Sequence, residues 1–99
     1  VVTQNGVAFF QPDEVTQTYA RLRPHFNDVS FYTAAIPTYY GGLMTFGWAT
    51  DNTELRRQSS ATIATRFERL GIDTRFYTPD VHVGAFALPR YIQDCFDRD

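Results

Sequence analysis

The chain has 99 residues, 43% of them hydrophobic, which is enough for one small domain with a core. Its net charge of −2 gives no basic surface for nucleic acid, and no apolar run reaches the length of a membrane-spanning helix. The single cysteine cannot form an internal disulfide and the amino terminus lacks the pattern of a secretory signal, so we expect a soluble cytoplasmic protein.

The chain opens within a predicted strand. Residues 1–4 are a β-branched run, and Asn5-Gly6 predicts a turn after it. Because a domain seldom begins with a strand already under way, we expect a fragment or a processed product of a longer protein. A helix is expected from Pro12, which suits the first helical position, and Asp13 and Glu14 suit the positive end of the helix dipole.

The middle of the chain predicts one helix and two strands. The helix carries an apolar stripe at spacings of four, three and four, namely Val15, Tyr19, Leu22 and Phe26. Strands are expected over 29–36 and 43–50, joined by a loop over 37–42. Six loop residues are too few for a parallel crossover, so the strands should pair antiparallel. Since apolar groups occupy both strand faces, we expect a sheet covered on both sides.

The last part of the chain is predicted to be mainly helical. A helix over 54–70 is either continuous or interrupted at Ser59, whose hydroxyl can cap a new start. A short extended stretch is expected over 74–77, and further helices begin near Thr78 and Pro89. The helix over 54–70 is expected to bury a stripe of Ile63, Phe67 and Leu70. The last helix carries an apolar stripe of Tyr91, Ile92, Cys95 and Phe96. The order strand, helix, strand, strand, helix, helix indicates an α/β protein.

Three stretches carry a resemblance to a known family. They are Gln4-Asn5-Gly6 with the Phe-rich run into Gln11-Pro12, Ala35 to Gly42 followed by Met44-Thr45-Phe46, and Arg75 to His82 continued by Gly84 to Pro89. In this order and spacing they resemble the end of the catalytic domain of the spermidine synthases, the polyamine aminopropyltransferases. The resemblance covers essentially the whole chain. Departures are Tyr40, where many relatives have Pro, and Met44, where some have Trp.

The resemblance implies the C-terminal portion of a Rossmann-like, methyltransferase-type sheet that ends in an antiparallel strand pair with flanking helices. The family transfers an aminopropyl group from decarboxylated S-adenosylmethionine to putrescine, giving spermidine and methylthioadenosine, without a metal or redox cofactor. It also implies a homodimer. The family's Gly-rich nucleotide loop, its acidic ribose-binding residue and its Asp-containing loop have no counterpart in residues 1–99. We therefore expect a fragment without the nucleotide-binding half, which depends on the missing N-terminal part and is inactive alone.

The expected site residues bind the acceptor amine. Tyr39 is the first of them, because its phenol lies in a loop between strands, where binding residues collect, and matches the family motif. Gln4, at the carboxyl end of a strand, either orients a substrate amine or caps the adjacent turn. Pro37 and Thr38 are expected to shape the wall of the slot, and Met44 to line it or to pack beneath it.

Other reactive side chains have simpler explanations. His82 is expected to satisfy a hydrogen bond or support a loop, and Cys95 to be a small buried hydrophobe. The two do not make a metal site, because no second pair of ligands lies at suitable spacing. Trp48 is expected in the core. Two alternatives stay open: a methyltransferase-fold enzyme with another substrate, and a stand-alone, non-catalytic interaction module.

Overall fold

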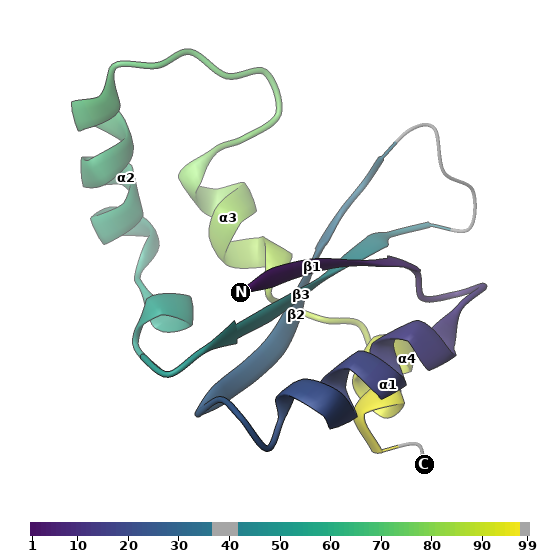
Figure 1. The fold of residues 1–99 in the computed structure, drawn as a ribbon. Coiled ribbons are helices and arrows are strands. Elements are labelled where there is room, and N and C mark those ends of the chain that lie inside the picture. The colour runs from purple at the N-terminus through teal and green to yellow at the C-terminus, as the bar shows by residue number, and fades with distance from the viewer. Residues whose placement is uncertain (37–41, 98–99) are drawn as a thin grey trace.

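A computed structural model describes residues 1–36 and 42–97, which form a three-stranded sheet with helices on both of its faces (Figure 1). The elements in chain order are β1 (Val2–Val7), α1 (Pro12–Leu22), β2 (Asp28–Ala34), β3 (Met44–Thr50), the 3₁₀-helix η1 (Leu55–Arg57), α2 (Ser60–Leu70), α3 (Pro79–Ala85), α4 (Arg90–Gln93) and the 3₁₀-helix η2 (Asp94–Asp97). The strand order is β1-β3-β2, and β3 pairs antiparallel with both neighbours. The α/β class and the antiparallel pair are thus confirmed.

β1 runs through Asn5 and Gly6, so the turn predicted there is wrong. Between Gln4 and Val7 the pairing with β3 shifts, which is a β-bulge. Gly6 has φ +76°, in the left-handed region that glycine adopts without steric cost. The Asn-Gly signal therefore marks a kink within the strand, and the chain turns later, over residues 8–10.

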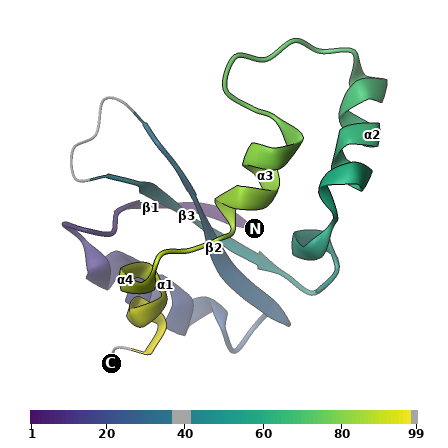
Figure 2. The ribbon, with the colours of Figure 1, turned by 180° about the vertical axis from the view of Figure 1, so that it is seen from behind.

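One face of the sheet packs against α1, α4 and η2, and this interface holds the main core (Figure 2). The buried cluster consists of Ala8, Val15, Phe31, Ile92 and Cys95, with Tyr19, Leu88 and Phe96 packed against it. The Phe96 ring lies between those of Tyr19 and Phe31, at centroid distances of 4.6 Å and 5.5 Å. Full burial of a side chain such as Phe31 stabilises the fold by roughly 1.5–3 kcal/mol.

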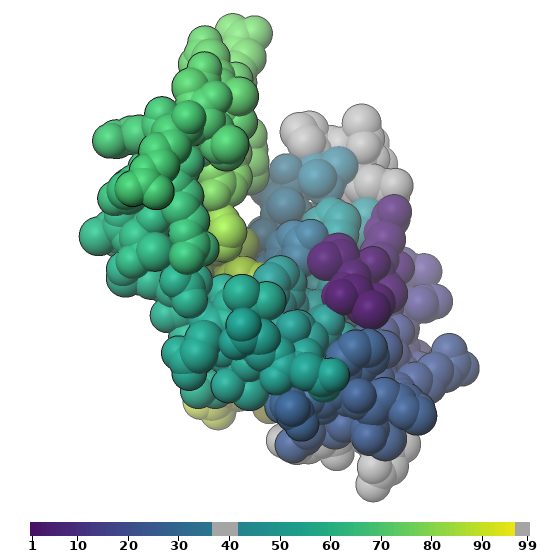
Figure 3. Space-filling model, turned by 60° about the vertical axis from the view of Figure 1, so that its left-hand side comes forward, coloured from purple at the N-terminus to yellow at the C-terminus, as the bar shows by residue number. Residues whose placement is uncertain are grey.

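The opposite face of the sheet is covered by α3 and the residue that follows it. The Phe86 ring lies 5.5 Å from that of Tyr32 and 5.3 Å from that of Trp48. Trp48 is thus packed on this second face and only partly buried, outside the main core. In the described residues α2 packs chiefly on α3, and Figure 3 shows it standing out from the sheet as a separate column. Leu70, at its end, is 66% exposed, so its predicted burial is wrong.

The helix predicted over 54–70 is interrupted, because the Ser59 hydroxyl accepts a hydrogen bond from the Thr62 amide at 3.2 Å and begins α2 there. The Thr78 hydroxyl starts α3 in the same way, accepting from the Val81 amide at 3.0 Å. The extended stretch predicted over 74–77 is wrong, since residues 75 and 76 form a bend. No helix in the described ranges is long and apolar enough to cross a membrane.

Candidate functional site

The end of β1 and the base of the β2–β3 loop lie side by side at one edge of the sheet. Met44 is paired with Val7 of β1 on one side and with Ala34 of β2 on the other. β2 ends at Ala34 and β3 begins at Met44, and because β3 is the strand that pairs with β1, the start of β3 lies next to the end of β1 (Figure 1). Val7 and Met44, which are 37 residues apart in sequence, are thereby brought side by side.

Gln4 lies on β1 three residues before this edge and is exposed. It pairs with Phe46, which pairs in turn with Tyr32, so the three side chains project from the same face of the sheet. This is the face against which α3 packs. Within the described part of the chain its side-chain amide makes no hydrogen bond, and the turn that it was expected to cap does not exist. The amide therefore has its two donors and its acceptor oxygen available for a ligand.

Met44 lies at the centre of the edge, but its side chain is only 2% exposed. Between β1 and β2 it offers almost no surface to a ligand. Met44 would thus affect a binding slot only indirectly, through the position of the residues packed against it. Tyr39, Pro37 and Thr38 lie outside the described residues, so their expected roles stay predictions.

Asn5, next to Gln4, is a polar residue of this region that sequence reasoning missed. Its side chain is only 4% exposed, and its amide hydrogen-bonds to Thr3, to the Gly47 backbone and to α1. The signal in the sequence was the Asn-Gly pair itself, which was assigned to a turn. The small and polar residues Thr45 and Gly47 on the opposite strand were the second signal, because they leave room for a bulge.

An aromatic pocket of about 300 Å³ lies between the sheet and α3, next to the end of β2. Its walls include the rings of Tyr32, Trp48, Phe76, Tyr77, His82 and Phe86. One polar pair lies in this wall, where the Tyr77 hydroxyl and the His82 Nδ1 are 2.8 Å apart. The expectation that His82 satisfies a hydrogen bond is thereby confirmed. In the described ranges no three His, Cys, Asp or Glu side chains could hold a metal ion.

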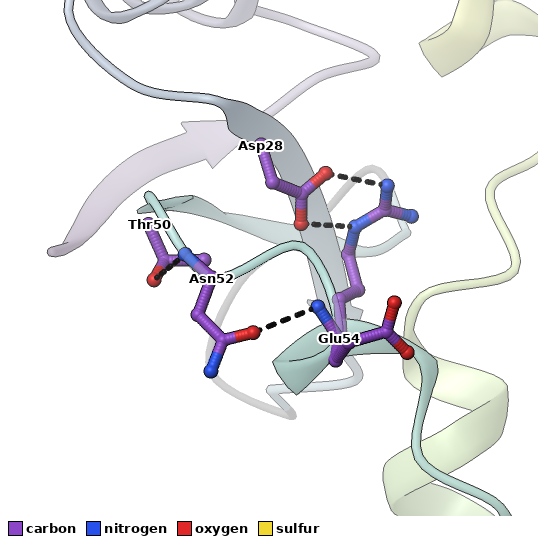
Figure 4. Close-up of polar contacts among 5 residues, drawn as sticks. Asp28, Thr50, Asn52 and Glu54 are labelled. Atoms are coloured by element: carbon purple, nitrogen blue, oxygen red, sulfur yellow. Dashed lines mark hydrogen bonds and ion pairs between the residues drawn. The ribbon is translucent and has the colours of Figure 1, made fainter.

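An ion pair between Arg56 and Asp28 lies at the other end of β2, away from the candidate site, and is structural. Arg56 donates from Nε to Asp28 Oδ2 at 3.0 Å and from Nη2 to Oδ1 at 2.7 Å (Figure 4). These hydrogen bonds hold the pKa of the Asp28 carboxyl below its ordinary value of 3.8, against the opposing effect of burial. Beside it, the Thr50 hydroxyl accepts from the Asn52 amide, and Asn52 Oδ1 from the Glu54 amide, which fixes the turn after β3.

Comparisons with known proteins agree with this arrangement. A family model described as "Spermine/spermidine synthase domain" matches residues 1–59. The polyamine aminopropyltransferase of Salmonella arizonae is 56% identical over 93 residues, which cover 94% of this chain and 32% of that protein. The enzyme of the same name from Pectobacterium atrosepticum is 56% identical over 91 residues, with 92% and 32% covered. The chain thus spans about a third of the length of these curated relatives.

Solved structures show the same fold. The crystal structure of spermidine synthase from Thermotoga maritima superposes with a TM-score of 0.82 at 18% sequence identity, over 97% of this chain and 33% of that one. A spermidine synthase in complex with the transition state analogue AdoDATO gives a TM-score of 0.82 at 18% identity, over 97% and 32%. Each likeness extends over nearly all of the present chain.

Proposed function

Since the chain belongs to the spermine/spermidine synthase family, we propose that the protein of which it spans about a third transfers an aminopropyl group from decarboxylated S-adenosylmethionine to putrescine. The products are spermidine and methylthioadenosine. The chain supplies the wall on the putrescine side, and the nucleotide-binding half lies in the remainder of the protein. There the three strands complete a Rossmann-like sheet at β1, which in the described residues pairs only with β3. We further infer a cytoplasmic homodimer.

The observation that carries the proposal is the pairing of Met44 with Val7 and Ala34. It brings the start of β3, which follows the segment that contains Tyr39, beside the strand that carries Gln4. A phenol oxygen and an amide oxygen can both accept hydrogen bonds from the amines of a diamine, while apolar walls suit its methylenes. Such a wall holds a slender dication extended, and positioning of this kind contributes much of the catalysis.

The reaction needs one neutral amine on putrescine. The lone pair of that nitrogen attacks the carbon beside the sulfonium, so that a C–N bond forms, the C–S bond breaks and its electron pair returns to sulfur. The proton released from nitrogen passes to a general base. The described residues place no carboxylate pair at the edge of the sheet: Asp28 is held by Arg56 at the other end of β2, and Asp13 and Glu14 lie in the first turn of α1. The base is therefore proposed to lie in the remainder of the protein.

A thermal-shift titration of the intact protein tests the assignment. Putrescine and methylthioadenosine should each raise the melting temperature. A ligand concentration of a hundred times its dissociation constant increases the free energy of unfolding by about 2.7 kcal/mol. Butane-1,4-diol, which has the same carbon chain without charges, is the matched control and should have no effect.

The outcomes separate the alternatives. If methylthioadenosine stabilises the protein while putrescine does nothing, the enzyme acts on another acceptor and the diamine assignment fails. If neither ligand stabilises it, the enzyme assignment fails. A cooperative, monomeric circular-dichroism melt of the chain on its own would then favour an interaction module, whose exposed apolar residues would include Leu70, Ile72 and Phe76.

A further inference from the structure

We propose that Asn5 is a positioning residue of the acceptor site, which holds the bulge of β1 and thereby keeps Gln4 on the substrate side of the sheet. The inference rests on the proposed function, because it assigns Asn5 a role only through Gln4. Asn5 itself is buried on the opposite face of the sheet, against α1.

The Asn5 amide uses its full hydrogen-bonding capacity. Its Oδ1 accepts from the Thr3 hydroxyl at 2.6 Å and from the Gly47 backbone N–H at 3.1 Å. Its Nδ2 donates to the Thr18 hydroxyl at 2.6 Å and to the Glu14 carbonyl at 3.5 Å. An amide side chain has two donors and two acceptor lone pairs, so all four are satisfied. One side chain thus links β1 to β3 and to α1 at the position of the bulge.

Two residues of β3, Thr45 and Gly47, also fix the bulge. The Thr45 hydroxyl, fully buried, donates to the Gly6 carbonyl at 2.7 Å and holds the second residue of the bulge. At Gly47 a Cβ atom would lie 2.9 Å from Asn5 Oδ1, closer than real Cβ contacts come, so only glycine fits opposite the amide. The bulge is therefore specified by several residues, with Asn5 at its centre.

Loss of the bulge would reverse the side on which Gln4 projects. Val7 pairs with Met44 and Gln4 with Phe46, so three steps on β1 match two on β3. If regular pairing continued from Val7 without the extra residue, Gln4 would lie opposite Gly47. A shift of one residue moves a side chain to the other face of a sheet. Because the Gln4 amide makes no hydrogen bond of its own in the described residues, its direction depends on this backbone.

A double-mutant cycle in the intact enzyme tests the inference, with putrescine as acceptor. We expect Gln4→Ala and Asn5→Ala each to raise the KM for putrescine on the order of tenfold, the value of one productive hydrogen bond. Inhibition by methylthioadenosine, which reports on the donor site, should stay within twofold. The double variant should be no worse than Gln4→Ala alone, because Asn5 acts through that residue.

The control variant is Thr16→Val. It removes another hydrogen bond of α1, from the Thr16 hydroxyl to the Cys95 carbonyl at 2.7 Å, away from the bulge, and should leave the putrescine KM unchanged. Asn5→Asp should recover part of the loss, because its carboxylate can still accept from Thr3 and Gly47, and from Thr18 once that hydroxyl reverses its direction. Should Asn5→Ala fail to fold, the cycle is run with Thr45→Val, which releases the Gly6 carbonyl.

Each outcome either supports or overturns the positioning role of Asn5. Losses that add up in the double variant, or an unchanged putrescine KM in folded Asn5→Ala, would overturn the positioning role of Asn5 and leave the proposed function standing. An unchanged KM in Gln4→Ala would remove Gln4 from the acceptor site, and with it the role of Asn5. A non-additive pair, with the donor site unaffected, supports the inference.

Discussion

Replacing Arg56 with Met should destabilise the protein by about 2–3 kcal/mol at neutral pH. The substitution keeps much of the apolar stem but removes two charge-assisted hydrogen bonds, of 2.7 Å and 3.0 Å, from a carboxylate whose side chain is only 7% exposed. Each such bond is worth about 1.5–3 kcal/mol when desolvated, and breaking a buried pair costs about 3–5 kcal/mol. Because the Arg56 side chain is 22% exposed, water replaces part of the lost interaction. The expected loss of stability is therefore about 2–3 kcal/mol, below that of a fully buried pair.

The destabilisation by Arg56→Met should become smaller at low pH. Arg56 lowers the folded-state pKa of Asp28 below 3.8, so the carboxylate contributes stability that is fully present above that pH and is lost as the pH falls through the lowered value. The difference between wild type and Arg56→Met should therefore be constant near neutrality and shrink below about pH 4. Urea unfolding of the intact protein, followed by circular dichroism, measures it.

Arg57→Met is the matched control, because Arg57 is exposed, makes no side-chain hydrogen bond in the described residues and lowers the pKa of Asp28 only through its charge, the smallest of the causes. Its effect should stay within about 0.5 kcal/mol. A loss in Arg56→Met no larger than in the control would refute the reasoning. So would a loss that persists unchanged at pH 3, since it would then owe nothing to the charge on Asp28.

Three further predictions concern the site and the backbone around it. Tyr39→Phe should weaken putrescine use more than methylthioadenosine binding, and Tyr39→Ala more still; steady-state kinetics with an unchanged putrescine KM and kcat would remove Tyr39 from the site. Gly6→Ala, at φ +76°, should lower the free energy of unfolding by about 1–2 kcal/mol, whereas Gly84→Ala, whose Cβ meets nothing, should not; equal melting temperatures would contradict this. Tyr77→Phe should cost about 0.5–1.5 kcal/mol by freeing His82, and unchanged amide exchange over 71–82 would argue against it.

The elements were largely predictable because their signals are local. Pro12 with two acids after it begins a helix, the Ser59 and Thr78 hydroxyls cap two more, and the short loop forces an antiparallel pair. These features depend on a few neighbouring residues. The boundaries of β2 and β3 were therefore predicted to within two residues.

The incorrect predictions concern features that depend on residues distant in sequence. Asn5-Gly6 has a turn signature, but the side chains of Thr18 and Thr45 convert it into a bulge within a continuous strand. Leu70 continues an apolar stripe, yet α2 extends beyond the sheet and leaves it exposed. Neither outcome is visible in local periodicity, because each depends on how elements pack.

The candidate site was predicted in part. The position of Gln4 opposite Phe46, near the start of β3, follows from the strand order β1-β3-β2, which the sequence did not specify without the family resemblance. The sequence left two roles open for Met44, and its burial favours packing over lining the slot, because the residue lies between two strands. Asn5 was overlooked because a buried amide is recognised only by its partners.

A crystal structure of the intact protein with putrescine bound tests the central claim most directly. The account predicts a diamine nitrogen within hydrogen-bonding distance of Tyr39 Oη or of the Gln4 side-chain amide, with the methylenes along the loop that joins β2 to β3. A diamine bound elsewhere, with this loop and the end of β1 turned away from it, would contradict the assignment of both residues.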